Sequence, residues 1–148
     1  MSLRMSDVRA LASGLDRLTA WLRRQTPTQV SSSTITALDR LRTEGPLRVS
    51  ELAVREAMTQ PGVTMLVNRL ADAGYAERVP DPTDRRASLV RITADGEAVL
   101  IARYAARAEV IRTALAELST DDQQLLSAAL PAIERLVATR TDKSRKNR

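Results

Sequence analysis

The sequence contains no cysteine, no histidine and no phenylalanine. Without cysteine there are no disulfides, thiolate zinc sites or thiol redox chemistry, and the chain fits a reducing compartment, the cytoplasm. Without histidine, the commonest general base and the commonest metal ligand are missing. No group of carboxylates or lysines offers a replacement. We therefore expect no enzyme activity, no metal site and no cofactor.

Long apolar runs are also missing. No stretch approaches the ~18 apolar residues of a membrane span, and the first ten residues lack the apolar core of a secretory signal. With 148 residues, of which 43% are hydrophobic and 28% charged, the chain is expected to form one soluble globular domain. We expect no membrane partner.

The net charge of +5 favours a polyanionic partner. However, residues 139–148 hold five basic residues and one acid, and so supply four of those five charges. We predict residues 140–148 to be a basic, disordered tail, which is more often a solvated end than a specific contact. A nucleic-acid partner therefore has to be inferred from the middle of the chain.

The middle of the chain, residues 31–93, has the pattern of three helices followed by a hairpin. Caps, glycine breaks and apolar spacing predict a helix from the serine run 31–33 to Gly45, a helix over 51–57 capped by Ser50, a helix capped by Thr59 and ended by Gly74, and strands over 76–80 and 88–92. The apolar residues expected to be buried on the last two helices are Leu52, Ala53, Ala57, Val63, Leu66, Val67, Leu70 and Ala71. This order suits a domain that lays one helix in a DNA groove.

The helix after Thr59 would leave a polar face outward. A groove-reading helix needs amide, hydroxyl and guanidinium groups there, and Gly62 would let the backbone approach DNA closely. We predict DNA contacts from Thr59, Gln60, Pro61, Gly62, Thr64, Met65, Asn68 and Arg69, and from Ser50 at the start of the preceding helix. Taken alone, the pattern fits an ordinary amphipathic helix better.

The loop between the two strands is long and charged. Asp84 precedes Arg86 by two residues, so a bent turn would let its carboxylate hold the guanidinium in one pose. A fixed arginine at a hairpin tip suits the minor groove, and Arg85 would reach a phosphate. The alternative is a soluble turn, because Asp-Pro and Asp-Arg are common in turns.

The helices at the two ends carry narrow apolar rows. Residues 1–30 and 94–139 are expected to form a helical dimerisation region, with a long helix over 94–118 and a last helix capped by Ser119 or Thr120. The predicted dimer contacts are Val8, Leu11, Leu15, Leu18, Leu22, Leu126, Leu130, Ile133 and Val137. Packing within one chain is the alternative. Trp21 lies beside the first row, where it either packs against the dimer core or lines a ligand pocket.

These motifs resemble the MarR-type winged helix-turn-helix regulators. The resemblance rests on Gly45-Pro46-Leu47 with 49–53, on 60–64, on the break from Leu70 to Gly74, and above all on the wing motif 81–86 followed by Ile92-Thr93-x₂-Gly96. It implies a mostly helical (α+β) winged helix-turn-helix fold of about six helices and a two- or three-stranded wing sheet. Terminal helices of two chains would intertwine, and Arg86, oriented by Asp84, would enter the minor groove.

The resemblance also implies a function. Such proteins bind double-stranded DNA as homodimers and repress genes until a small, often anionic aromatic effector weakens binding. Lacking cysteine and histidine, this chain departs from the family's thiol peroxide sensors and zinc sensors. Two alternatives stay open: a winged-helix module that binds proteins instead of DNA, and a small-molecule-binding protein.

Overall fold

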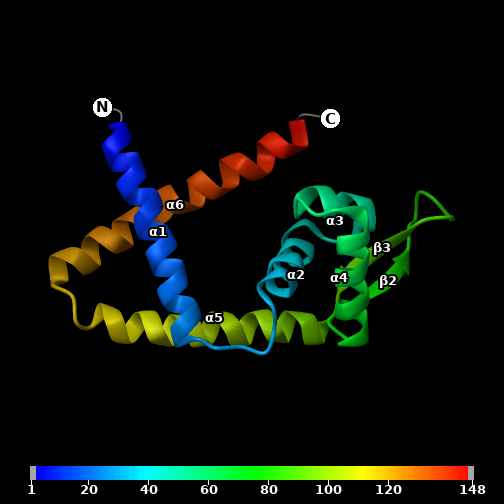
Figure 1. Ribbon diagram of the computed structural model, residues 1–148, viewed down its shortest axis with the longest axis horizontal. Helices are drawn as coiled ribbons and strands as arrows, with labels where there is room; N and C mark the ends of the chain where they lie inside the picture. Colours follow the sequence, from blue (N-terminus) through cyan, green and yellow to red (C-terminus); the bar gives the residue numbers. More distant parts are fainter. Residues whose placement is uncertain (1–2, 147–148) are drawn as a thin grey trace. The chain divides into compact units, whose positions relative to one another are not determined.

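The computed structural model describes residues 3–146, and it describes no side chains beyond residue 138 (Figure 1). Within this range the elements follow in the order α1 (Met5–Gln25), α2 (Ser32–Glu44), β1 (Leu47–Arg48), α3 (Val49–Arg55), α4 (Gln60–Asp72), β2 (Ala76–Pro80), β3 (Ser88–Ile92), α5 (Ala94–Leu115) and α6 (Thr120–Lys146). The predicted winged helix-turn-helix with six helices is confirmed. No helix of the described residues is long and apolar enough to cross a membrane.

The chain divides into two compact units that meet after Ala108. The first unit holds α1 to α4, the three strands and most of α5, and the second holds the end of α5 and α6. The functional division predicted above, with residues 31–93 as the DNA-binding lobe, stays a prediction.

The sheet of the first unit has the strand order β1-β3-β2, and both pairs are antiparallel. Both hairpin strands have their predicted limits. Arg78 on β2 pairs with Val90 on β3, which in turn pairs with Leu47 on β1. The third strand is the short piece before α3, so the sheet fixes the start of α3 relative to the wing.

The core of the first unit lies where α2, α3 and α4 meet this sheet and the first turns of α5. Its fully buried side chains are Leu38, Leu41, Leu52, Leu66, Leu70, Leu100, Val63, Val67 and Val90. The predicted inward face of α4 is therefore correct, except that Ala71 is exposed. Truncating one such leucine to alanine typically costs ~2–5 kcal/mol, so this core sets the position of α4.

Two helices begin earlier than predicted. From the sequence, Asp7 is the expected cap of a first helix that runs to about Arg24, and Ser50 is the expected cap of the third. In the structure Arg4 and Arg48 occupy the N-cap positions of α1 and α3. An acid three residues into each helix reaches back instead: Asp7 Oδ2 accepts from the Arg4 amide at 3.3 Å and Glu51 Oε2 from the Arg48 amide at 2.9 Å. This acidic half of a capping box satisfies the cap without a serine side chain.

Other helix ends depart from prediction more locally. Ala57, expected to be buried, is exposed with a φ of 51° where the chain turns after α3. The long helix predicted over 94–118 ends at Leu115 as α5, and Leu100 is its fully buried large side chain. Ser119 Oγ accepts from the Asp122 amide at 3.1 Å and so caps α6, one of the two residues proposed. The backbone of α6 continues to Lys146, into the predicted tail 140–148, whose side chains lie outside the described residues.

The joint between α4 and α5 explains the glycine of the wing motif. Gly74, at φ 75°, ends α4, with the Tyr75 amide bonded to Leu70 O at 2.8 Å. Thr93 Oγ1 then donates to Gly74 O at 2.6 Å. A Cβ at Gly96 would lie 2.2 Å from Tyr75 O, so only glycine lets α5 pack this closely against the end of α4. The long helix α5 therefore packs directly against the end of α4.

Candidate DNA-binding surface

Helix α4 is held at its N-terminus by the predicted cap. Thr59 Oγ1 accepts from the Gly62 amide at 3.3 Å, and proline sits in the first turn, where a missing N–H leaves no acceptor unsatisfied. With its apolar face buried, α4 presents its opposite face to solvent along one row: Pro61, Met65, Asn68 and Asp72, all exposed. We call these four residues the outer row of α4. Their spacing of 4, 3 and 4 places them one above the other.

The other predicted residues of α4 flank this row. Gln60 and Arg69 are exposed, as expected. Thr64 is only half-buried, and its hydroxyl donates to Gln60 O at 2.8 Å, so it is already engaged within its own helix. Asn68 Oδ1 accepts from Arg78 Nη2 of β2 at 3.4 Å, which orients the amide from the wing side. Of the predicted contact residues that flank the outer row, Gln60 and Arg69 are therefore open to solvent, whereas Thr64 is less available.

The structure adds local detail for two of the predicted DNA-contacting residues, Gly62 and Ser50, whose contact with DNA stays a prediction. A Cβ at Gly62 would lie 3.1 Å from Thr59 Oγ1 and 3.5 Å from Met58 Cε. Because glycine has no side chain, it leaves room for the Thr59 hydroxyl that caps α4. Ser50 is exposed in the first turn of α3, where it is not the cap but remains open to a phosphate.

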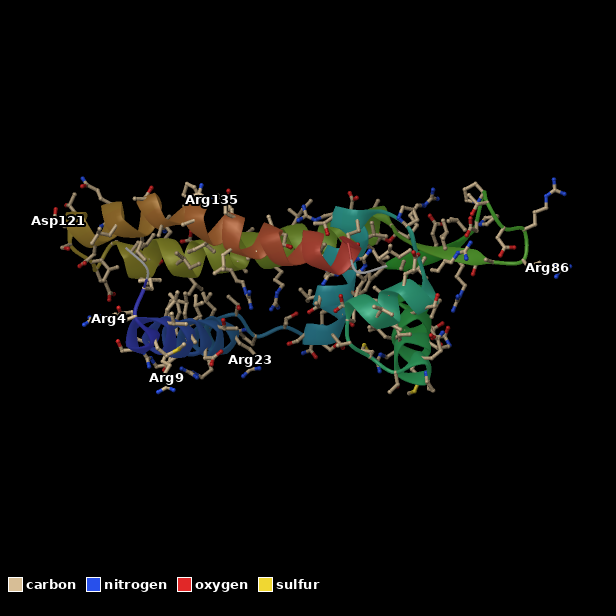
Figure 2. All side chains as sticks on the ribbon, turned by 90° about the horizontal axis from the view of Figure 1, so that it is seen from above. Arg4, Arg9, Arg23, Arg86, Asp121 and Arg135 are labelled. Carbon is tan, nitrogen blue, oxygen red and sulfur yellow. The ribbon has the colours of Figure 1, made fainter. Side chains whose placement is uncertain are left out.

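At the wing tip, Asp84 forms a different hydrogen bond from the one predicted. Asp84 Oδ1 accepts from the backbone amide of Arg86 at 3.0 Å. Within the described residues no ion pair joins Asp84 to the Arg86 guanidinium, so this expectation was wrong. A short aspartate reaches the amide two residues on and closes an Asx-turn. Figure 2 shows the Arg86 side chain at the end of the loop, pointing away from the hairpin. Arg85 is exposed as well.

The residue that anchors the wing was missed. Asp81 is only 6% exposed, and its Oδ1 accepts from the Thr83 hydroxyl at 2.7 Å and from the Thr83 amide at 2.8 Å. Its Oδ2 accepts from Arg48 Nε at 2.8 Å. The Thr83 bonds first, and then the Arg48 guanidinium, lower the pKa of Asp81 to about 2. Asp-x-Thr signals the local turn in the sequence, but nothing there indicates a partner 33 residues earlier.

A second group of charges fixes α3 against α2. Arg40 Nε lies 3.1 Å from Glu56 Oε1, and Arg40 Nη1 lies 3.0 Å from Glu44 Oε1. Glu44 Oε2 is also 3.1 Å from Arg55 Nη2. These side chains are mostly shielded from water, so their attraction is less screened than at an open surface. These ion pairs therefore hold the end of α3, where the turn to α4 begins, against α2.

The predicted dimer residues lie on exposed faces of the two terminal helices. On α1, Val8, Leu11, Leu15 and Leu18 are 43% to 49% exposed, while Leu22 is buried within the chain. On α6, Leu126, Leu130, Ile133 and Val137 are 46% to 63% exposed. Apolar rows of this length are more than scattered surface residues. Leu22 is thus the one predicted dimer residue that the single chain already covers.

A groove of about 660 Å³ lies between α2 and the end of α4. It is lined by Gln29, Val30, Ser31, Ser33 and Thr34 before and within α2, and by Arg69, Leu70, Ala73 and Tyr75 around the end of α4. Trp21 is half-buried and, among the described residues, is not part of this lining. The predicted pocket role of Trp21 stays a prediction, whereas Arg69 belongs both to this lining and to α4.

Comparisons with known proteins agree with this geometry. The model of the MarR family matches residues 28–87. An HTH-type transcriptional regulator of Mycobacterium bovis, Mb0904, is 36% identical over 137 residues, which cover 89% of this chain and 95% of that protein. The transcriptional regulator Tm0710 of Thermotoga maritima matches in structure with a TM-score of 0.73 at 26% identity, covering 94% of this chain and 99% of that one. RV1404 of Mycobacterium tuberculosis shares the fold with a TM-score of 0.78 at 23% identity, over 93% and 97%.

Proposed function

The chain belongs to the MarR family of DNA-binding transcriptional regulators, and from this premise we propose that it is a homodimeric repressor of a pseudo-palindromic operator. In this proposal α4 enters the major groove and reads bases, while Arg86 enters the neighbouring minor groove and Arg85 pairs with a phosphate. Ser50, at the start of α3, is proposed to contact the backbone.

The observation that carries this proposal is the pairing of two exposed features on one rigid lobe. The outer row of α4 is open to solvent, Arg86 lies at the far end of the wing (Figure 2), and its neighbour Arg85 is exposed as well. The Arg48–Asp81 ion pair ties the wing to the start of α3. Because a single core holds helix and wing, both can engage adjacent grooves without a rearrangement.

Dimerisation is supported by the exposed apolar rows on α1 and α6. Covering these rows with a second copy would remove them from water, which is favourable by about 25 cal/mol per Å². Two-fold symmetry then presents two α4 helices to DNA. It predicts half-sites about one helical turn, ~34 Å, apart.

We further propose that a small anionic or aromatic effector weakens DNA binding. The groove beside α4 supports this, because Arg69 contributes a charge to its lining and the partly exposed Val30 and Tyr75 contribute apolar surface. An occupant there would touch the end of the reading helix. No catalytic activity is proposed, and we place the protein's action in the cytoplasm, where bacterial DNA is accessible.

Selection of random duplexes by the purified protein tests the proposal. We expect an enriched inverted repeat whose affinity falls steeply with salt, because each arginine–phosphate contact releases counterions. Enrichment of no sequence would reject operator binding and favour a protein-interaction module. An enriched site without an inverted repeat would retain DNA binding but reject the symmetric dimer. For the effector, thermal-shift screening of small aromatic acids would give the ligand, and its effect on operator affinity would test repression.

A further inference from the structure

Met65 is the one large apolar side chain that α4 exposes, on a helix whose residues are all described. It is 63% exposed. Its neighbours on the outer row are Pro61, one turn before, and Asn68, one turn after. Met65 therefore lies near the centre of the face that the proposed function directs into the major groove.

The position contrasts with the other exposed apolar residues. Most large ones lie on α1, α5 and α6, where a second copy would cover them. Among the described residues of 31–93, Val54 and Met65 are the only large apolar residues that are exposed. Val54 is on α3, off the outer row, so it provides a matched comparison for Met65.

The chemistry of the major groove offers one apolar feature, the C5-methyl group of thymine. An unbranched thioether is flexible and polarizable, so it can settle against such a methyl group. The adjacent Asn68 carries the amide that pairs with adenine N6 and N7. Its Oδ1 is approached from the wing side by Arg78, which restrains its pose. Side by side, an apolar and an amide side chain fit an A·T-rich step.

We propose that Met65 is a specificity-determining residue that contacts the methyl group of a thymine in each half-site. Asn68 reads an adenine at the same or the neighbouring base pair. This inference rests on the proposed function, because it requires α4 in the major groove. It specifies thymine as the base that Met65 contacts, which the fold of the chain does not determine.

Deoxyuridine scanning of the enriched operator tests the proposal. Each thymine of one half-site is replaced in turn by deoxyuridine, which removes the methyl group and leaves base pairing unchanged. We expect the parent protein to lose affinity about fourfold at one thymine, the value of one buried methyl group. Met65→Gln, of similar length and helix propensity, should bind thymine and deoxyuridine operators equally at that position.

Two further variants separate this contact from general effects on binding. Met65→Leu keeps an apolar side chain and should keep the deoxyuridine penalty. Val54→Gln removes the comparison residue on α3 and should keep the penalty as well. Equal penalties in the parent and Met65→Gln would overturn the proposal, as would a half-site in which no thymine is sensitive. In either case operator binding itself still stands, whereas failure to enrich any operator would reject the proposed function first.

Discussion

Arg48 and Asp81 form an ion pair in which Arg48 Nε donates to Asp81 Oδ2 across 2.8 Å. Arg48 is the last residue of β1 and caps α3, whereas Asp81 follows β2 and opens the wing loop. One contact thus links the start of the helix-turn-helix to the base of the wing. The bond also raises the pKa of Arg48.

The stability of the protein should depend on Asp81 in a defined acid range. Its pKa is lowered to about 2 in the folded state, below the ~3.9 of an unfolded chain. The charged form is therefore favoured by folding, so its contribution is complete above pH ~4 and is lost as the pH falls towards 2. Denaturant titration should find Asp81→Asn less stable than the parent at pH 7, with the difference shrinking below pH 4. A difference that stays constant between pH 7 and 2.5 would contradict this assignment.

Arg86→Ala should weaken operator binding by ~1–3 kcal/mol, because an exposed arginine at the wing tip loses its groove contact. The structure adds a sharper pair of variants. Since Asp84 bonds to the Arg86 amide and not to its guanidinium, Asp84→Asn retains the turn and should bind DNA nearly as well as the parent. Asp84→Ala removes the turn and should bind more weakly. Fluorescence anisotropy at fixed salt measures the operator affinity of all three variants. Equal losses of affinity for Asp84→Asn and Asp84→Ala would instead favour a contact between the Asp84 carboxylate and the Arg86 guanidinium.

Leu15→Glu should convert the proposed dimer to a monomer. Leu15 lies in the middle of the exposed row of α1, and a buried unpaired carboxylate there would cost several kcal/mol. Sedimentation equilibrium should report a mass near 16.3 kDa instead of twice that value. Val54→Glu alters another exposed apolar residue, on α3 and away from the row, and should leave the mass unchanged. A dimeric Leu15→Glu protein would show that this row is not the interface.

Tyr104→Phe should loosen the attachment of the lobe to α5. The Tyr104 hydroxyl donates to Asp39 Oδ1 at 2.6 Å, and the Arg42 guanidinium lies 5.5 Å from the ring centroid. Burial, followed by this bond, raises the pKa of Tyr104. Losing the bond should lower the free energy of unfolding by ~0.5–1.5 kcal/mol, towards the lower value because the ring remains partly exposed.

The same variant should tolerate altered operator spacing better. In the parent, inserting one base pair between half-sites should weaken binding strongly, because α2 is fixed to α5 through Tyr104 and Asp39. Comparing both operators with both proteins isolates this effect. An identical spacing penalty in Tyr104→Phe would show that the core around Leu100 alone fixes the lobe.

Local signals in the sequence determined most of the fold. The apolar spacing of Val63, Leu66 and Leu70 gave the inward face of α4, since the helical period places such residues together. Thr59 and Gly74 marked its ends because cap chemistry involves only nearby backbone groups. The hairpin limits followed from the helix break at Gly74 and from the charged loop between the two strands. All of these signals act within a few residues.

Tertiary structure decided what depends on distant partners. The caps of α1 and α3 lie earlier than predicted because Asp7 and Glu51 reach back to the amides of Arg4 and Arg48. The Arg48–Asp81 pair and the Tyr104–Asp39 bond join residues 33 and 65 positions apart, and no local pattern encodes such a meeting. The sequence by itself thus specified the amphipathic helix α4 and an arginine-tipped wing. Only the packed chain decided that the wing is anchored by Asp81, because burial and ion pairing arise when separate elements come together.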